Sequence, residues 1–257
     1  MDILDRFRPH PRAPHAAPGP RVPDGLRVYA IGDIHGCLDL LDRLHARIES
    51  DAAGLPAGTD KLLIYLGDYV DRGPRSRQVV ECLMAGPPPG FRAVYLRGNH
   101  EDYLIRFLTD LSVGSSWWRF GGLETLASYG VDLSMVTPVA EKLRRGQQSL
   151  KLLLPPAHRA FLTALPLSVV VGDYFFCHAG VRPGVALAAQ DVDDLLWIRD
   201  DFLNCNDDLG KIVVHGHTVS HYPDVRGNRI GIDTGACFTG HLTCLVLERN
   251  TARFLQT

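Results

Sequence analysis

Residues 26–37 have the sequence LRVYAIGDIHGC, and this stretch decides the fold. Its apolar, β-branched run predicts a buried strand over Leu26–Ile31. The run stops at a glycine, and Asp33 and His35 follow at once. The same pattern of an apolar run, a glycine and polar residues recurs in LIYLGDYVDRG, residues 63–73. Each strand is therefore expected to deliver polar side chains to the loop at its carboxyl end.

Three later segments share this pattern: AVYLRGNHE (93–101), YFFCHAG (174–180) and IVVHGHT (212–218). Loops at the carboxyl ends of strands in an α/β sheet converge on one crevice, so five such ends predict a single site. The polar residues that follow the five runs are Asp33, His35, Asp68, Asp71, Asn99, His100, His178, His215 and His217.

The segments around these runs alternate between strand and helix patterns, which predicts an α/β fold. Helices are expected over Leu38–Ile48, Arg75–Met84 and Asp102–Leu111, and Gly172-Asp173 has the composition of a hairpin turn. The expected strands are Leu26–Ile31, Lys61–Leu66, Ala93–Leu96, Ser168–Val171, Tyr174–Cys177, Lys211–Val214, Arg229–Ile232 and Leu242–Leu247.

Two segments lack this alternation. Residues 1–24 contain six prolines, which remove backbone donors and disfavour helix, so they predict an extended N-terminal arm ahead of one domain over residues 25–257. Residues from about 114 to 166 have no strand pattern and predict a helical cap or insert.

Composition excludes several partner classes. The 257 residues carry 27 Lys and Arg against 29 Asp and Glu, and the basic residues are scattered, so no nucleic-acid partner is expected. No apolar run approaches the roughly 20 residues that span a bilayer, so no membrane partner is expected either. Six cysteines without a CxxC pair, and no signal-peptide pattern, predict a cytoplasmic protein with reduced thiols.

Carboxylate, amide oxygen and imidazole side chains together suit a site for two divalent transition metals. One bridging carboxylate can hold two ions about 3.5–4 Å apart, and Asp68 is the predicted bridge. A single DxH or GNH pattern is more often a hydrogen-bonded strand end. The metal centre is predicted from the five patterns occurring together.

The motifs GDIHGC (32–37), GDYVDRG (67–73), LRGNHE (96–101), CHAG (177–180) and HGHT (215–218) resemble the signature of the calcineurin-like metallophosphoesterases. They are most similar to the phosphoprotein phosphatase branch, the serine/threonine phosphatases, with its phage and bacterial members. The resemblance covers residue 26 to the C-terminus. It implies a β-sandwich-type α/β metallophosphoesterase fold with βαβ units and a helical insert, and makes residues 25–257 the catalytic domain.

The resemblance also implies the metal ligands. Two divalent ions are expected, with Mn²⁺ as the assay metal and Fe or Zn also fitting the ligand types. The implied ligands are Asp33 and His35 on the first ion, Asp68 bridging both, and Asn99, His178 and His217 on the second, with Asn99 also binding phosphate.

Four further residues match functional positions of that branch. His100 and Asp71 resemble its acid dyad, in which His100 donates a proton to the leaving group and Asp71 orients the imidazole and favours its charged form. Arg72, and Arg199 in LLWIRD, resemble two phosphate-binding arginines. Val219 stands where nucleases of the superfamily carry another histidine, which favours the phosphatase branch.

The expected function is a metal-dependent phosphomonoesterase, foremost a serine/threonine protein phosphatase, in which a hydroxide bridging two ions attacks the phosphate ester. One alternative is a symmetrical dinucleoside polyphosphate hydrolase acting on diadenosine tetraphosphate. Another is a catalytically silent metal-binding scaffold or sensor. The expected partner is a phosphoprotein or small phosphoester, without a regulatory subunit.

Two sequence features suggest rival chemistry. Cys177 lies beside His178, but no CxxxxxR phosphate loop surrounds it, so this thiol is expected only to pack. Trp117 and Trp118 have rings that can stack on a nucleobase, although adjacent aromatic residues more often pack in a core.

Overall fold

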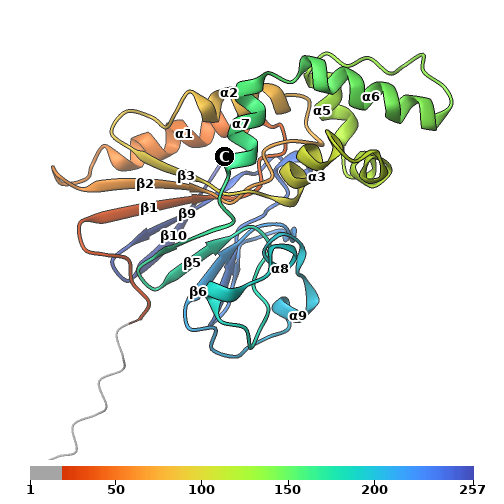
Figure 1. Cartoon of the computed structure of the whole chain (residues 1–257). Coiled ribbons are helices and arrows are strands. Elements are labelled where there is room, and N and C mark those ends of the chain that lie inside the picture. Colours follow the sequence, from red (N-terminus) through yellow and green to blue (C-terminus); the bar gives the residue numbers. More distant parts are fainter. Residues whose placement is uncertain (1–18) are drawn as a thin grey trace, which may run out of the picture.

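The computed structural model describes residues 19–257. Its strands form two five-stranded sheets, with the order β10-β9-β1-β2-β3 in the first and β4-β5-β6-β8-β7 in the second. The two sheets stack face to face (Figure 1). The strands are β1 (Leu26–Ile31), β2 (Asp60–Tyr65), β3 (Arg92–Tyr95), β4 (Ser168–Val171), β5 (Tyr174–Cys177), β6 (Ile212–His215), β7 (Asp224–Val225), β8 (Arg229–Gly231), β9 (Thr243–Glu248) and β10 (Thr251–Gln256).

Helices cover the outer face of each sheet. In Figure 1, α1 (Leu38–Ala52), α2 (Ser76–Met84) and α7 (Pro156–Ala164) lie over the first sheet, and α8 (Val192–Trp197) and α9 (Asp200–Leu203) lie beside the second. The molecule is therefore a β-sandwich with helices on both outer faces, which confirms the predicted fold class.

The alternation of side chains along β1 explains the layers. Tyr29 and Ile31 pack in the core under α1 and α2, whereas Val28 and Ala30 pack in the core between the sheets. Successive side chains of a strand point to opposite faces, so a strand buried on both faces is apolar throughout. The continuous apolar runs of the sequence are thus the central strands of the sandwich.

The parallel strands bring the polar loops to one edge. β1, β2 and β3 pair in parallel, as do β5, β6 and β8. The two sets meet where Nδ1 of His178, just after β5, donates to the carbonyl of Leu66, just after β2, at 3.0 Å. The carboxyl ends of strands from both sheets therefore border one site.

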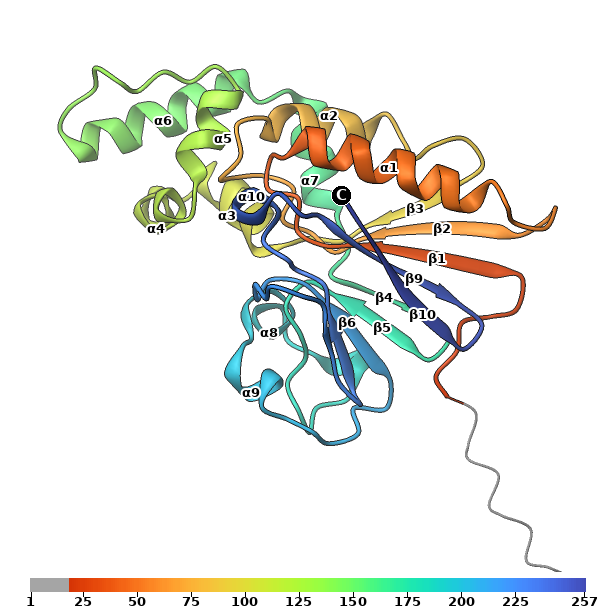
Figure 2. The same cartoon turned by 180° about the vertical axis from the view of Figure 1, so that it is seen from behind.

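The predicted insert is helical. Residues 114–166 contain α4 (Gly114–Arg119), α5 (Gly122–Ser128) and α6 (Val139–Leu153), which project beyond α3 (Asn99–Phe107) in Figure 2, and also α7, which lies over the first sheet. Short helices η2 (Leu111–Val113), η3 (Leu187–Ala189) and α10 (Ala236–Thr239) complete the described elements. No helix within residues 19–257 is long and apolar enough to cross a membrane.

Several element bounds differ from the sequence prediction, most of them by one residue. The helix expected over Asp102–Leu111 runs from Asn99 to Phe107. It begins at Asn99 because Gly98 caps it and the carboxylate of Glu101 accepts the Gly98 N–H at 2.9 Å. Helix α1 runs on from Ile48 to Ala52. Strands β7 and β10 were not predicted, and β10 pairs antiparallel with β9 along the edge of the first sheet.

The predicted N-terminal arm falls mostly outside the described residues, which leave out positions 1–18. Its last six residues, 19–24, are described. Val22 is fully buried between the sheets, and its N–H donates to the carbonyl of Arg249 at 2.9 Å. This end of the arm therefore packs against the domain.

Candidate active site

The backbone adopts a rare conformation at the motif residues. Within residues 19–257, six non-glycine residues have a positive φ, a conformation that side chains of L-residues disfavour. Such strain clusters at functional sites, where the surrounding structure maintains it. Five of the six belong to the motifs, namely His35, Asp68, Asp71, Arg72 and His217.

The turn that carries Asp68 is held by a buried carboxylate. Glu101 accepts the N–H groups of Asp68 and Tyr69 at 2.8 Å each and that of Val70 at 3.2 Å. A Cβ at Gly98 would lie 2.1 Å from Oδ1 of Asp68, so only glycine fits there. Sequence reasoning assigned Glu101 no role, although it ends the LRGNHE motif. Its place at the start of α3 positions the predicted bridging ligand.

Two groups of ligand atoms share Asp68. His35, Asp68 and His100 form one group, and Asp68, His178 and His217 the other, with the ligand atoms of each group within 4.8 Å of one another. Nε2 of His35 lies 3.5 Å from Oδ2 of Asp68, and Nε2 of His178 lies 3.4 Å from Oδ1. The two carboxylate oxygens thus face different histidines, which is the arrangement of a bridging ligand.

Hydrogen bonds fix the tautomers of two of these histidines. Nδ1 of His35 lies 2.9 Å from the carbonyl of Val70, and Nδ1 of His178 lies 3.0 Å from that of Leu66. A carbonyl only accepts, so each Nδ1 carries the proton and each Nε2 presents a lone pair. Nε2 of His35 is buried without a hydrogen-bond partner among the described residues. Such a lone pair fits a metal ligand.

Asn99 brings an amide oxygen between two imidazoles. Its Oδ1 lies 2.8 Å from Nε2 of His178 and 2.9 Å from Nδ1 of His217. The lone pair of His178 and the amide oxygen are both acceptors, so their convergence fits a shared cation. The predicted ligands of the second ion therefore lie together.

Asp33 lies apart from these two groups of atoms. Its carboxylate accepts the N–H of His217, with Oδ2 at 3.0 Å. It also neighbours Asp233, a buried acid that sequence reasoning missed. Burial and the charges of Asp233 and Asp68 raise the pKa of Asp33 well above its usual value. The signal for Asp233 was present in the sequence, because it directly follows the predicted strand Arg229–Ile232.

The predicted acid pair is formed. Nδ1 of His100 lies 2.6 Å from Oδ2 of Asp71. Asp71 also accepts hydrogen bonds from Nε1 of Trp117 at 2.7 Å and Oγ1 of Thr125 at 2.5 Å. Burial raises the pKa of Asp71 to about 7, against these donors, which lower it. Both Trp117 and Thr125 come from the insert, and neither was assigned this role from the sequence.

The pKa of His100 shifts in the direction opposite to the one expected from the sequence. Burial, followed by the charge of Arg72, holds the pKa of His100 well below its usual value, whereas the sequence analysis expected Asp71 to favour the charged imidazole. Both members of the pair are almost completely buried, so desolvation of the charged forms dominates. Burial therefore disfavours the state in which Asp71 is ionised and His100 is charged.

Both predicted arginines lie at the rim of the site. The half-buried Arg72 has Nη2 3.3 Å from Nε2 of His100, and its guanidinium lies 5.6 Å from the ring centroid of the exposed Phe238. The exposed Arg199 donates from Nη1 to Oγ1 of Thr218, next to His217, at 3.1 Å. Both guanidinium groups therefore lie beside residues of the candidate site.

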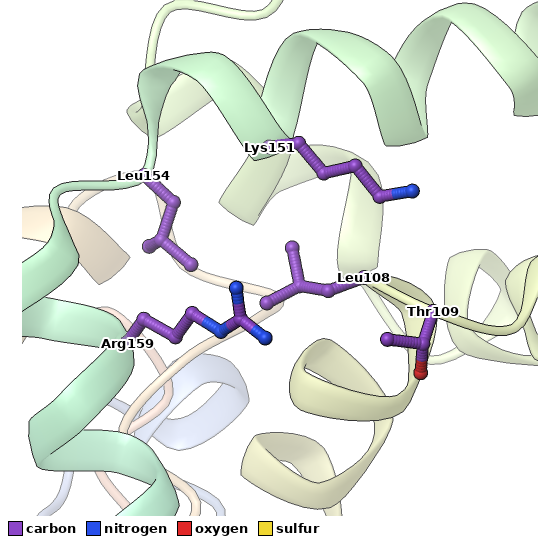
Figure 3. A pocket seen from close by; sticks show the side chains of 5 residues that line it. All are labelled: Leu108, Thr109, Lys151, Leu154 and Arg159. Atoms are coloured by element: carbon purple, nitrogen blue, oxygen red, sulfur yellow. The ribbon is translucent and has the colours of Figure 1, made fainter.

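The rival chemistries find no support in the geometry. Cys177 is fully buried, its thiol donates to the carbonyl of Gly180 at 3.4 Å, and burial raises its pKa, so it lacks the character of a nucleophile. Trp117 is fully buried and cannot stack on a nucleobase. A separate cavity of about 430 Å³ contains none of the site residues (Figure 3); it is lined by Leu108, Thr109, Lys151, Leu154 and Arg159.

Relatives of known name share most of the chain. The asymmetrical bis(5'-nucleosyl)-tetraphosphatase PrpE of Anoxybacillus flavithermus is 29% identical over 235 residues, which are 84% of this chain and 88% of that protein. PrpE of Bacillus subtilis is 30% identical over 240 residues, 83% of this chain and 87% of that protein. These relatives bear the name of a dinucleoside polyphosphate hydrolase rather than of the serine/threonine phosphatase branch that the motifs suggested.

Solved structures show the same fold. A crystal structure described as that of a candidate diadenosine tetraphosphatase has a TM-score of 0.59 at 21% identity, covering 93% of this chain and 94% of that one. A serine/threonine phosphatase of Saccharomyces cerevisiae has a TM-score of 0.53 at 16% identity, covering 90% and 79%. The calcineurin-like phosphoesterase family matches residues 26–242, and the chain belongs to this family.

Proposed function

We propose that this protein hydrolyses dinucleoside tetraphosphates asymmetrically, releasing a nucleoside triphosphate and a nucleoside monophosphate. The names of relatives about 30% identical over more than four fifths of the chain support this activity. It reverses the order of the sequence prediction, which placed a protein phosphatase first. It also replaces symmetrical by asymmetrical cleavage in the alternative.

The observation that carries the proposal is the pair of ligand groups that share Asp68 beside His100. Two divalent ions, when bound, neutralise phosphate oxygens and activate a water molecule for attack. The orphaned lone pair of His35 and the acceptors converging on Asn99 fit such ions. The proposed ligands are Asp33, His35 and Asp68 for one ion and Asp68, Asn99, His178 and His217 for the other.

The chain's own residues supply the remaining chemistry. The guanidinium groups of Arg72 and Arg199 bind phosphate oxygens, for which their planar forks are suited, and Asn99 contributes to the same binding. Nε2 of His100 donates a proton to the leaving oxygen, and Nδ1 takes up a proton from the carboxyl group of Asp71, so the pair is left as a neutral imidazole and an ionised carboxylate. Both members of the pair are buried.

Product analysis tests the proposal. The protein is loaded with Mn²⁺, and in parallel with Fe²⁺ or Zn²⁺, and incubated with diadenosine tetraphosphate, and the nucleotides are separated by anion-exchange chromatography. Equal amounts of ATP and AMP are expected, and EDTA is expected to abolish the reaction. Two molecules of ADP would indicate symmetrical cleavage. Faster hydrolysis of a phosphoserine peptide would restore the protein phosphatase, and inertness towards every phosphoester would indicate a scaffold.

A further inference from the structure

A second cavity, of about 480 Å³, has Trp197 in its lining, and the ring of Trp197 neighbours that of His217. Its lining residues come from α3, η2 and α4 and from α8. Two aromatic residues, Tyr103 and Trp197, line it together with the polar residues Arg106, Ser116 and Asp193. None of these five residues was assigned a role from the sequence.

The aromatic wall of this cavity is continuous with the candidate site. The ring centroid of Trp197 lies 6.1 Å from that of His217 and 5.0 Å from that of Tyr103. Tyr103 stacks on Phe120 at 6.0 Å, and Phe120 lies 6.3 Å from His100. The same wall therefore contacts a proposed metal ligand at one end and the proposed acid at the other.

Helix α3 sets the distance between the two places. It begins at Asn99, and Tyr103 and Arg106 follow four and seven residues later. At 1.5 Å per residue they lie roughly 6 Å and 10 Å along the helix axis from Asn99. Residues at this spacing share one helix face. A phosphate held at the start of α3 would thus have its substituent extending along the helix into the cavity.

The lining chemistry suits a nucleoside. Phe120 covers one face of Tyr103, and the remaining surfaces of Tyr103 and Trp197 are available to a planar base. The carboxylate of Asp193 has no side-chain hydrogen bond or ion pair with residues 19–257, so it is free to accept hydrogen bonds from a ribose diol. The Arg106 guanidinium, further along α3 from the phosphate, adds a polar group that can orient the base.

We propose that this cavity binds the nucleoside next to the phosphate that is attacked. The inference rests on the proposed function, since it assumes a nucleotide substrate, and it assigns recognition of that nucleotide to the insert and α8. The cavity would thus let the same metal site bind a nucleotide more tightly than a simple phosphate ester.

Product inhibition tests the cavity without relying on dinucleotide cleavage. Hydrolysis of p-nitrophenyl phosphate is measured with AMP and with inorganic phosphate as inhibitors. We expect AMP to bind the wild-type protein at least about fivefold more tightly than phosphate, the lower end of what stacking of one base contributes. Ser116→Trp fills the cavity and should raise the inhibition constant of AMP to that of phosphate. Ser115→Trp is the matched control, because exposed Ser115 on the same helix does not line the cavity.

Asp193→Asn examines the ribose contact. It should weaken AMP inhibition several-fold and leave inhibition by 2',3'-dideoxy-AMP unchanged, because the dideoxy sugar lacks the diol. Equal inhibition by AMP and phosphate in the wild type would overturn the cavity proposal, as would a full AMP preference in Ser116→Trp. If diadenosine tetraphosphate is not cleaved but the AMP preference disappears in Ser116→Trp, the proposed function fails and the nucleotide site stands.

Discussion

The loops at the strand ends and the helical insert contribute to the same site in different ways. The loops after β1, β2, β5 and β6, with the first turn of α3, carry every proposed metal ligand. The insert carries none, but its Trp117 and Thr125 hold Asp71, and its Ser116 lines the cavity beside Trp197. The strand ends therefore carry the proposed metal ligands, while the insert contacts the proposed acid pair and lines part of the proposed nucleoside cavity.

This difference explains why the strand ends carry recognisable sequence motifs and the insert does not. A metal ligand must supply a particular donor atom, so the strand ends carry recognisable motifs. An orienting or lining residue needs only to place a donor or a ring, which many sequences can do. The following predictions address the two regions in turn, from the largest expected effect to the smallest.

Asp68→Asn should have the largest effect. It removes the charge that the two ligand groups share while preserving the shape of the side chain. Metal content by elemental analysis should fall below two ions per chain, and activity should fall by at least roughly 10³-fold, since the ions supply both charge neutralisation and the nucleophile. Asp60→Asn, at an exposed position away from the site, should change neither quantity. Retention of two ions in Asp68→Asn would refute the bridge.

His100→Asn tests whether His100 acts as the acid or as a metal ligand. We expect kcat for an alkyl phosphate monoester to fall by about 10²–10⁴-fold with metal content unchanged. The loss should be smaller with diadenosine tetraphosphate, because a leaving phosphate is less basic than an alkoxide and needs less protonation. The nitrogen of His100 lies within ligand distance of His35 and Asp68, so loss of metal in this variant would make it a ligand instead.

Trp117→Phe should have the smallest effect. It removes one of the donors that lower the pKa of Asp71, so the pair holds its proton more tightly. The basic limb of the pH–kcat profile should move to higher pH, and kcat should fall by roughly tenfold, about the value of one hydrogen bond to a charged group. Trp118→Phe is the matched control, because Trp118 does not contact Asp71. An unchanged pH–kcat profile in Trp117→Phe would show that Trp117 of the insert does not affect proton transfer by Asp71 and His100.

Much of the fold follows from local pattern. The strands Leu26–Ile31, Ser168–Val171 and Tyr174–Cys177 have the predicted bounds, because apolar runs bounded by glycine and turn residues leave little choice of structure. The start of α3 was misplaced by three residues, since the Glu101 carboxylate that accepts the Gly98 N–H also serves the distant Asp68 turn. Strand β10 was not predicted because its residues Thr251–Arg253 are all exposed and do not alternate between buried and exposed positions.

The candidate site was predictable to a similar extent. The polar residues at the ends of the apolar runs could be named from the pattern, and the resemblance to the metallophosphoesterases implied which of them are ligands and which form the acid pair. Glu101 and Asp233 lie in the same motif neighbourhoods but were left without roles. Their importance depends on what their carboxylates face, namely the N–H groups of the Asp68 turn and the side chain of Asp33. Sequence spacing does not report such contacts.

The sequence by itself determined the family, the order of the central strands along the chain and the residue types at their ends, because these depend on periodicity and donor atoms within short segments. Only the tertiary structure decided which insert residues hold Asp71 and which helices enclose the cavity of Tyr103 and Trp197. It also decided that burial, rather than the neighbouring carboxylate, governs the pKa of His100. Each of these depends on contacts between distant segments, and such contacts exist only once the chain has folded.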